Sequence, residues 1–256
     1  MDDHENTRYW EANADEWVRL VRAGYDLARD FVNNPSFFAL LPDVHGLCGL
    51  DIGCGEGYNT RLVAERGARM FAIDVASGML RAAAVLGDGT RYARASGLAL
   101  PFADGSFDFA VAFMSLMDMP DRRRALGEAL RVVKAGGFLQ LSILHPCFAR
   151  PPFEWVNDDS GQRQARAVSD YFREHEGDVE EWTFGAARDD GLAPRPFRIP
   201  RFDATLATWL NDVADAGWRL ERVAEPRADA ATVERYSRLA YCAIVPWFLQ
   251  LRLRKA

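Results

Sequence analysis

Residues 50–57, which read Leu-Asp-Ile-Gly-Cys-Gly-Glu-Gly, hold the clearest chemical pattern in this chain of 256 residues. An apolar run ends in the carboxylate of Asp51, and glycines follow at every second position. A loop without Cβ atoms lets a ligand lie directly against the backbone. The dinucleotide fingerprint would place its third glycine where Tyr58 stands, so the spacing does not match it. Asp51 would also repel a pyrophosphate, whereas it would attract a ligand with a cationic end.

A second carboxylate, Asp74, follows the next apolar run at residues 70–73. A carboxylate at the tip of a second strand suits a pair of ribose hydroxyls, because it accepts two hydrogen bonds. Adenosine at one end and a cationic amino acid at the other describe S-adenosylmethionine. A nicotinamide-dependent oxidoreductase is the alternative, and both the glycine spacing and Asp51 disfavour it.

Four ordered blocks of the sequence resemble those of the class I S-adenosylmethionine-dependent methyltransferases. The pattern is most similar to the small-molecule enzymes that resemble the ubiquinone/menaquinone methyltransferases, and the blocks are residues 50–57, 72–80, 100–108 and 130–137. The resemblance implies a Rossmann-like, doubly wound α/β sheet of seven strands with the last strand antiparallel. It also implies S-adenosyl-L-methionine as methyl donor and S-adenosyl-L-homocysteine as product. A non-catalytic protein that only binds the donor would carry the same motifs.

The resemblance further implies which residues bind the donor. Asp51 is expected to hold the methionine amino group, Asp74 the ribose, and the glycine loop the methionine chain. Ser96 stands where many relatives carry an acid for adenine, so adenine recognition rests more on backbone. For Phe113 and Met114 plain core packing is an alternative. The expected set is Asp51, Gly53, Cys54, Gly55, Gly57, Asp74, Val75, Met79, Ser96, Gly97, Phe113 and Met114.

Alternating apolar strands and amphipathic helices predict a parallel sheet covered on both faces. Strands are predicted at residues 49–52, 70–73, 90–95, 107–113, 138–144, 218–224 and 241–253, the last broken near Pro246. Helices are predicted at residues 7–33, 59–66, 77–84, 122–134 and 203–216, with Ser77 and Asp203 as candidate N-caps. Ligands bind beyond the carboxyl ends of such strands, so one rim should collect Asp51, Asp74, Ser96, Phe113 and His145.

Four segments follow from this pattern. Residues 1–45 are interpreted as an N-terminal helical lid and 46–145 as the donor-binding core. Residues 146–202 break the pattern and are rich in aromatic side chains, which indicates an inserted cap on the acceptor side. Residues 203–256 return to the core sheet. Contacts to the acceptor are expected from lid and cap aromatics, with ordinary core packing as the alternative, at Tyr9, Trp10, Tyr171, Phe172 and Trp182.

Methyl transfer needs an in-line geometry from which water is excluded, and it needs a base only when the acceptor keeps a proton. His145 follows the fifth predicted strand and is the first candidate base, because imidazole titrates near neutrality. A structural histidine that orders the loop is the alternative. Asp118 is the second candidate. Catechol-type methyltransferases hold magnesium with closely spaced acids after the fourth strand, and because this chain offers only Asp118 there, it departs from that pattern and we predict no metal.

Bulk composition limits the partners. The formal net charge is −6, which disfavours nucleic acid and anionic membranes as partners. The four cysteines lack paired spacing, and the chain has no signal peptide or membrane-spanning run, so a cytoplasmic protein is expected. The hypothesis is methyl transfer, without a metal, to a small, partly apolar metabolite of aromatic or isoprenoid-like type. The aromatic cap could also serve as a homodimer surface, whereas the acceptor atom and pathway stay open.

Overall fold

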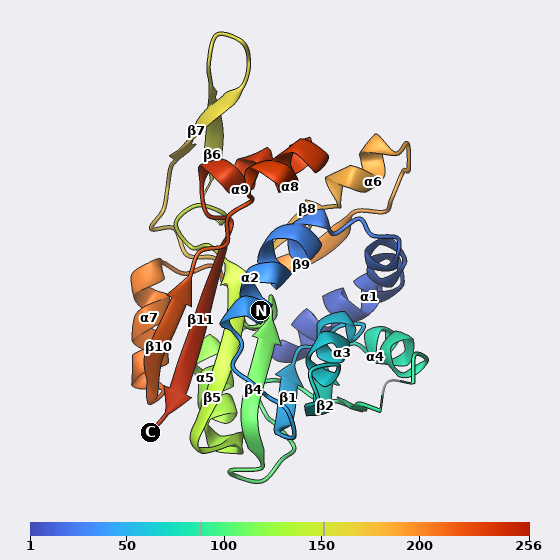
Figure 1. The fold of residues 1–256 in the computed structure, drawn as a ribbon, viewed down its shortest axis with the longest axis vertical. Coiled ribbons are helices and arrows are strands. Elements are labelled where there is room, and N and C mark those ends of the chain that lie inside the picture. Colours follow the sequence, from blue (N-terminus) through green and yellow to red (C-terminus); the bar gives the residue numbers. More distant parts are fainter. Residues whose placement is uncertain (88, 151) are drawn as a thin grey trace.

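The computed structural model describes residues 1–87, 89–150 and 152–256. One sheet of seven strands has the order β10-β11-β5-β4-β1-β2-β3 (Figure 1). Strand β11 is antiparallel to both of its neighbours, while β1, β2, β3, β4 and β5 pair in parallel. The predicted doubly wound sheet with an antiparallel last strand is confirmed. The strands are β1 Cys48–Ile52, β2 Arg69–Asp74, β3 Arg91–Arg94, β4 Phe107–Phe113, β5 Val133–Leu144, β10 Trp218–Ala224 and β11 Phe248–Lys255.

Helices cover both faces of this sheet because its strands are apolar on both sides. Along β4, Ala110 and Ala112 join the apolar cluster under α5 (Arg122–Val132) and α7 (Leu206–Asp215). The alternate residues Phe109 and Val111 join a second cluster with α2 (Asn34–Leu40) and α3 (Tyr58–Ala64). Helix α4 (Ser77–Ala84) follows β2.

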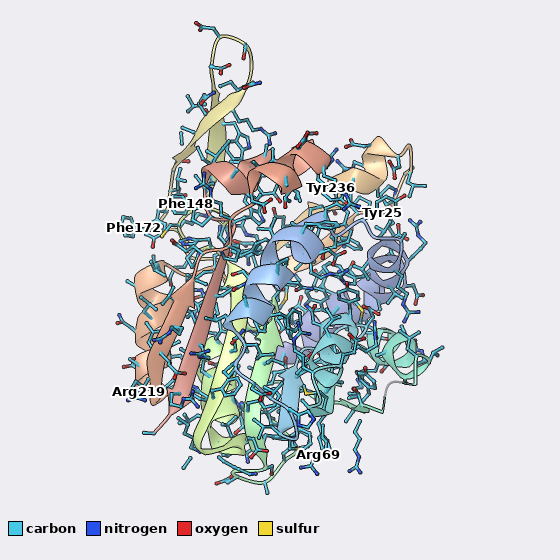
Figure 2. All side chains as sticks on the ribbon, in the orientation of Figure 1. Tyr25, Arg69, Phe148, Phe172, Arg219 and Tyr236 are labelled. Atoms are coloured by element: carbon cyan, nitrogen blue, oxygen red, sulfur yellow. The ribbon has the colours of Figure 1, made fainter. Side chains whose placement is uncertain are left out.

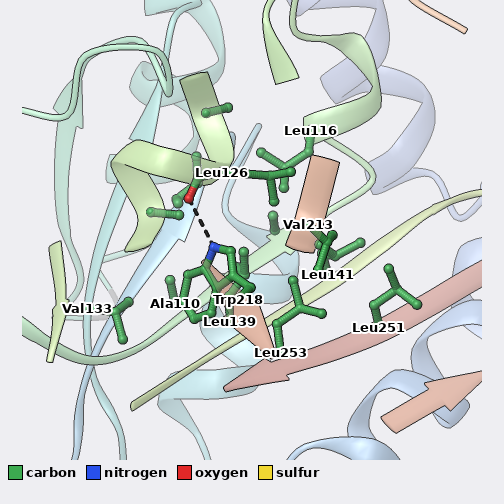
Figure 3. Close-up of a cluster of buried hydrophobic side chains, with 14 of the residues drawn as sticks. Ala110, Leu116, Leu126, Val133, Leu139, Leu141, Val213, Trp218, Leu251 and Leu253 are labelled. Atoms are coloured by element: carbon green, nitrogen blue, oxygen red, sulfur yellow. Dashed lines mark hydrogen bonds between the residues drawn. The ribbon is translucent and has the colours of Figure 1, made fainter. Parts of the chain in front are cut away.

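The cluster beneath α5 and α7 contains a buried indole that is also hydrogen-bonded. Trp218, at the start of β10, donates its Nε1–H to the carbonyl of Leu126 at 3.0 Å (Figure 3). The N–H of a buried indole usually has a hydrogen-bond partner of this kind. This bond ties the edge of the sheet to α5, the helix that follows the loop carrying Asp118.

The two ends of the chain differ from the predicted elements. Helix α1 runs from Asp3 to Arg22 and stops before Gly24, whose φ is 82°. A π-helical segment, η1 (Arg29–Asn33), then leads into α2, so Pro35 lies in the first turn of a helix and does not end one. At the other end, part of the predicted last strand is helical. The elements there are α8 (Ala230–Arg235), the 3₁₀ turn η3 (Ser237–Ala240) and α9 (Tyr241–Ile244).

Both predicted helix caps are wrong. Ser77 is the first residue of α4, and its backbone N–H is accepted by Glu11 of α1 at 2.5 Å. Helix α7 is capped by Thr205, which accepts from the N–H of Thr208. Asp203 instead forms ion pairs with Arg150 and Arg201 of the inserted segment.

Residues after β5 form two hairpins. Strands β6 (Phe153–Asn157) and β7 (Arg163–Val168) pair antiparallel and project beyond the body of the molecule (Figure 1). Strands β8 (Asp178–Trp182) and β9 (Phe197–Arg201) form the second hairpin, with the short helix α6 (Gly185–Asp189) between them. The second hairpin shares an apolar cluster with α1, so lid and cap residues pack together. No helix within the described ranges is long and apolar enough to cross a bilayer.

A buried polar network fixes η1 on the sheet. Gln250 of β11 is fully buried and donates to the backbone oxygen and to Oδ1 of Asn33 at 2.8 and 2.9 Å. Its Oε1 accepts from Ser36 at 2.9 Å, and Ser142 of β5 donates to the same Asn33 Oδ1 at 2.8 Å. Buried polar groups need such partners, so this network determines how η1 lies against the sheet.

Replacing Gln250 by alanine is therefore expected to lower the free energy of unfolding by about 1–3 kcal/mol, because buried partners on Asn33 and Ser36 are left unpaired. Equilibrium unfolding in urea measures the change. Gln164→Ala, on exposed β7, is the matched control and should stay within about 0.5 kcal/mol of the parent. A Gln250→Ala loss no larger than that of the control would contradict a stabilising network.

Candidate functional site

A cavity of about 1140 Å³ opens beyond the carboxyl ends of β1, β2 and β4. Open parallel sheets bind ligands at this edge. Segments that are far apart in the chain enclose it, because α1, η1 and the inserted hairpins all contribute walls. Most of the predicted donor set lines the cavity: Asp51, Gly53, Cys54, Gly55, Asp74, Val75, Met79, Ser96, Gly97, Phe113 and Met114. Gly57 does not; it is the N-cap of α3.

The glycine loop between β1 and α3 contains residues with positive φ, a conformation that residues other than glycine adopt only with strain. Gly53 and Gly55 have φ of 78° and 55°. The N–H groups of Gly53 and Cys54 both donate to the carbonyl of Ile73 at 2.9 Å, which anchors the loop to β2. A Cβ on Gly53 would lie 2.5 Å from that of Ser115, whereas a Cβ on Gly55 would meet nothing within 4 Å. Bare main chain at Gly55 therefore faces the cavity.

Asp51 is buried with only half of its carboxylate satisfied. The side chain is 1% exposed, and its Oδ2 accepts from Thr60 at 2.5 Å. Its Oδ1 is buried and has no hydrogen-bond partner among the described residues. Burial raises the pKa of Asp51 to about 7, with the charge of Asp74 adding to the rise and the Thr60 hydrogen bond opposing it. A cationic ligand group beside Oδ1 would restore the ionised form, so the residue fits an ammonium group.

Asp74 joins the two loops that enclose the donor end. Its Oδ2 accepts from the N–H of Gly55, and its Oδ1 accepts from the N–H of Ala76, both at 2.8 Å. Burial raises the pKa of Asp74, and these backbone hydrogen bonds act against that rise. Each carboxylate oxygen keeps a further lone pair, so the group can still accept from a ligand's hydroxyls.

The wall for a purine is mostly main chain and apolar side chain. Ser96 accepts from the N–H of Leu98 at 3.1 Å, so its hydroxyl already supports the local turn. A Cβ on Gly97 would lie 2.8 Å from the Met119 side chain, which shows how closely the two loops approach. Phe113 both lines the cavity and packs on Phe37 with 4.0 Å between ring centroids, so the core-packing alternative also holds for it.

Arg29 is a cavity residue that the sequence did not single out. It lies in η1, is 13% exposed, and places its guanidinium 4.0 Å above the ring of Tyr58. It pairs with Asp30 at 2.8 Å and with Asp26 at 3.9 Å. Single π-helical turns often occur at functional sites, but no sequence pattern announced this one.

Aromatic rings from the lid and the cap gather in one cluster on the wall of the cavity. Trp10 and Trp182 both line the cavity, as the predicted acceptor contacts would. Trp17 packs edge-on between them, with 5.7 Å from its ring centroid to each of the other two. Tyr25 belongs to the same apolar cluster and also lines the cavity.

Three predicted acceptor contacts lie away from the cavity wall. Phe172 is 82% exposed and points outward (Figure 2). The hydroxyl of Tyr171 accepts from the N–H of Leu206 at 2.8 Å and so supports the start of α7. The guanidinium carbon of Arg198 lies 5.7 Å from the ring centroid of Tyr9. Their positions correct the expectation that these residues meet the acceptor, since aromatic content alone does not tell which side of a hairpin or helix a ring takes.

His145 does not lie on the described cavity wall, contrary to its choice as first candidate base. Its side chain is 2% exposed, Nε2 donates to Glu225 at 2.9 Å, and Nδ1 accepts from the N–H of Cys147 at 3.1 Å. Burial lowers the pKa of His145, although Glu225 acts in the opposite direction. Both ring nitrogens are engaged, which matches the alternative of a histidine that orders the loop.

Asp118 is the candidate base that the structure brings to the cavity. It ends the 3₁₀ turn η2 (Leu116–Asp118) after β4 and is 7% exposed. No described residue hydrogen-bonds to its carboxylate, while its backbone oxygen accepts from Asn6 of α1 at 2.9 Å. Burial raises the pKa of Asp118 to about 7, and the charge of Arg150 opposes the rise. Within the described ranges, no group of three His, Cys, Asp or Glu residues is placed to hold a metal ion.

Comparison with known proteins agrees with this geometry. Residues 50–141 match a family model described as a methyltransferase domain. An uncharacterized methyltransferase of Mycobacterium sp. (strain JLS) is 29% identical over 182 residues, which are 64% of this chain and 69% of that protein. The demethylmenaquinone methyltransferase of Renibacterium salmoninarum is 32% identical over 121 residues, 47% of this chain and 50% of that one. The crystal structure of an S-adenosylmethionine-dependent methyltransferase from Mesorhizobium loti matches with a TM-score of 0.71 and 27% identity. The match covers 86% of this chain and 96% of that one.

The strand order, the glycine loop and these matches are those of class I S-adenosylmethionine-dependent methyltransferases, with the methyltransferase domain at residues 50–141. The predicted class of enzyme and its methyl donor, S-adenosyl-L-methionine, are confirmed. These matches favour methyl transfer over the alternative of a nicotinamide-dependent oxidoreductase, and a turnover screen tests the alternative of a non-catalytic binding protein.

Asp51→Asn is expected to weaken binding of S-adenosylhomocysteine at pH 8 by about 10-fold or more, because it removes one charge-assisted hydrogen bond worth about 1.5–3 kcal/mol. Isothermal titration calorimetry measures the affinity. Asp104→Asn removes an acid that is 81% exposed and serves as the control, with no change expected. An unaltered affinity in Asp51→Asn would show that Asp51 does not contact the donor.

Proposed function

We propose that the enzyme methylates a small, partly apolar metabolite with an aromatic or isoprenoid-like body. The observation that carries this proposal is the aromatic wall of the cavity, where Trp10, Trp17, Trp182 and Tyr25 share one apolar cluster; Met117 also lines the cavity. Flat aromatic walls and thioethers favour an apolar, planar guest. The net charge of −6 supports a small molecule over nucleic acid.

Donor binding in this proposal depends on groups of both signs. Bound S-adenosylmethionine supplies an electrophilic methyl group on a sulfonium ion. Asp51 holds its amino group, Asp74 holds its ribose, and the backbone around Gly55 lies along the methionine chain. Arg29 is placed at the same end and would pair with the methionine carboxylate. The loops after β1 and β4 thus position the donor while α1 and the second hairpin exclude water.

Asp118 acts as the general base of the proposed reaction. Its carboxyl group lines the cavity, and its pKa of about 7 is matched to proton transfer at neutral pH. A base with its ordinary pKa would be a much weaker proton acceptor. His145 is engaged through both nitrogens and is left with the role of holding the loop after β5.

The direct test is a screen for methyl transfer. The enzyme is incubated with donor labelled in its methyl group and with phenols, quinones, N-heteroaromatic compounds, isoprenoid alcohols and a tRNA fraction. Label is expected in one or more of the small aromatic or isoprenoid acceptors and absent from RNA. Transfer to RNA alone would contradict the proposal.

Asp118→Asn is expected to lower kcat by about 10²–10⁴-fold, the usual contribution of a general base, while donor affinity stays unchanged. In the parent enzyme, kcat/KM for the acceptor should fall as pH decreases through about 7, because the raised pKa leaves Asp118 protonated below that value. Saturating donor keeps the titration of Asp51 out of the profile. Retention of the acidic limb in Asp118→Asn would exclude Asp118 as the titrating base.

A further inference from the structure

Three polar side chains at the cavity, those of Asp118, Arg150 and Asn6, have hydrogen-bond donors or acceptors without a partner among the described residues. No described residue hydrogen-bonds to the carboxylate of Asp118, and Nη2 of Arg150 is buried without a hydrogen-bond partner among the described residues. Asn6 gives its Nδ2–H to the backbone of Asp118, and its buried Oδ1 is likewise unpartnered. All three side chains are nine-tenths buried or close to it, at 7%, 11% and 4% exposure.

An ion pair with Asp203 fixes the orientation of the Arg150 guanidinium. Its Nε is paired with Asp203, which is 7% exposed and is also paired with Arg201 of β9. Arg201 lies 3.8 Å from Glu180 on the facing strand β8 and donates to the backbone oxygen of Arg150. Asp203 therefore fixes the Nε edge of the Arg150 guanidinium, while Nη2 stays without a partner among the described residues and the residue lines the cavity.

The combination has a specific chemical meaning. Asp118 can accept a proton, and Arg150 can only donate hydrogen bonds. A buried polar group that is left unpaired destabilises the complex, so a ligand that matches both groups is favoured over one that matches neither. Sites built to hydrogen-bond a substrate group reject analogues that lack it far more strongly than apolar pockets reject a missing methylene.

Resting on the proposed function, we propose that the acceptor is a planar ring whose reacting O–H or N–H is flanked by a hydrogen-bond acceptor, either a carbonyl oxygen or a ring nitrogen. Asp118 takes the proton of the reacting group, and Arg150 donates to the flanking acceptor. Asn6 is a positioning residue, because it holds the backbone of the turn that carries Asp118.

The step is balanced without any further reactant. A lone pair on the acceptor oxygen or nitrogen forms the new bond to the methyl carbon as the bond from that carbon to sulfur breaks. The sulfur keeps the bonding electron pair and becomes a neutral thioether. The proton of the acceptor passes to Asp118, which returns it to solvent. Arg150 stays charged throughout and stabilises negative charge that spreads onto the flanking atom.

Two isomers with the same ring system test the proposal. In 1-hydroxyphenazine the hydroxyl is flanked by a ring nitrogen, whereas in 2-hydroxyphenazine it is not. With S-adenosylhomocysteine bound, calorimetric titration of the parent enzyme is expected to show at least about 10-fold tighter binding of the 1-isomer, which corresponds to one matched hydrogen bond. With the donor present, the 1-isomer should also be the faster substrate by mass spectrometry.

Arg150→Gln should remove this preference, bringing the two affinities within about threefold, while Arg150→Lys, which keeps the charge opposite Asp203, should retain part of it. Arg198→Gln is the matched control, because Arg198 is 60% exposed on β9 and pairs with Glu181; the preference should persist there. An unchanged affinity for S-adenosylhomocysteine reports that each variant is folded.

Several outcomes would overturn the proposal. They are equal binding of the two isomers by the parent, binding of neither, or a preference that survives Arg150→Gln. If an acceptor without a flanking hydrogen-bond acceptor is methylated as fast as the 1-isomer, the proposed function stands and the role of Arg150 fails. If the parent does not bind S-adenosylhomocysteine at all, the proposed function fails as well.

Discussion

Burial of a carboxylate without a counter-ion is the constraint on which this structure depends. Asp51 lies at the end of β1 with one oxygen held by Thr60 and the other unpartnered among the described residues. The protein accepts the cost of desolvating this acid, which raises its pKa to about 7. A donor with a cationic end relieves that cost, so binding energy is concentrated at the point where the methyl group must be oriented. Asp74 complements it by tying the loops on either side.

The same physical effect serves a second purpose at the acceptor end. Asp118 is also buried with its pKa raised to about 7, but it shares the cavity wall with Arg150, whose charge opposes that rise. Two acids of similar pKa can thus take different roles, because their neighbours differ. The lid helix α1 contributes to both ends: Glu11 accepts from the N–H of Ser77 near the ribose site, and Asn6 holds the turn of Asp118. Movement of α1 would therefore be felt by donor and acceptor alike.

The core sheet and the donor end could be predicted from the sequence, because each local pattern there is compatible with one structure only. The glycine loop with Asp51, the strand tip at Asp74 and the bounds of β4 and β10 follow from residue types and apolar runs, so the core sheet and donor end were predictable. The antiparallel last strand came from the resemblance to a known family. Helix α9 was missed because the apolar run at residues 241–253 fits helix and strand equally well before Pro246 is considered.

The acceptor end was predictable only in outline. Its walls come from α1, η1, η2 and two hairpins, whose packing depends on contacts between segments more than a hundred residues apart, such as Asn6 with Asp118. Aromatic content indicated a cap, but the choice between Trp182, which lines the cavity, and Phe172, which faces solvent, needs the hairpin geometry. Arg29, Arg150 and Arg201 are isolated cations in sequence and become a recognisable set only in three dimensions.

Proton release on binding shows whether the donor's ammonium group ionises Asp51. Calorimetric titration with S-adenosylhomocysteine at pH 7, in buffers of different ionisation enthalpy, measures the number of protons exchanged. We expect release of about half a proton per site, because a group with a pKa near 7 is about half protonated before a cation binds beside it. Asp51→Asn should abolish this release. Tight binding to the parent with no proton exchange, or with proton uptake, would mean that the ammonium group does not ionise Asp51.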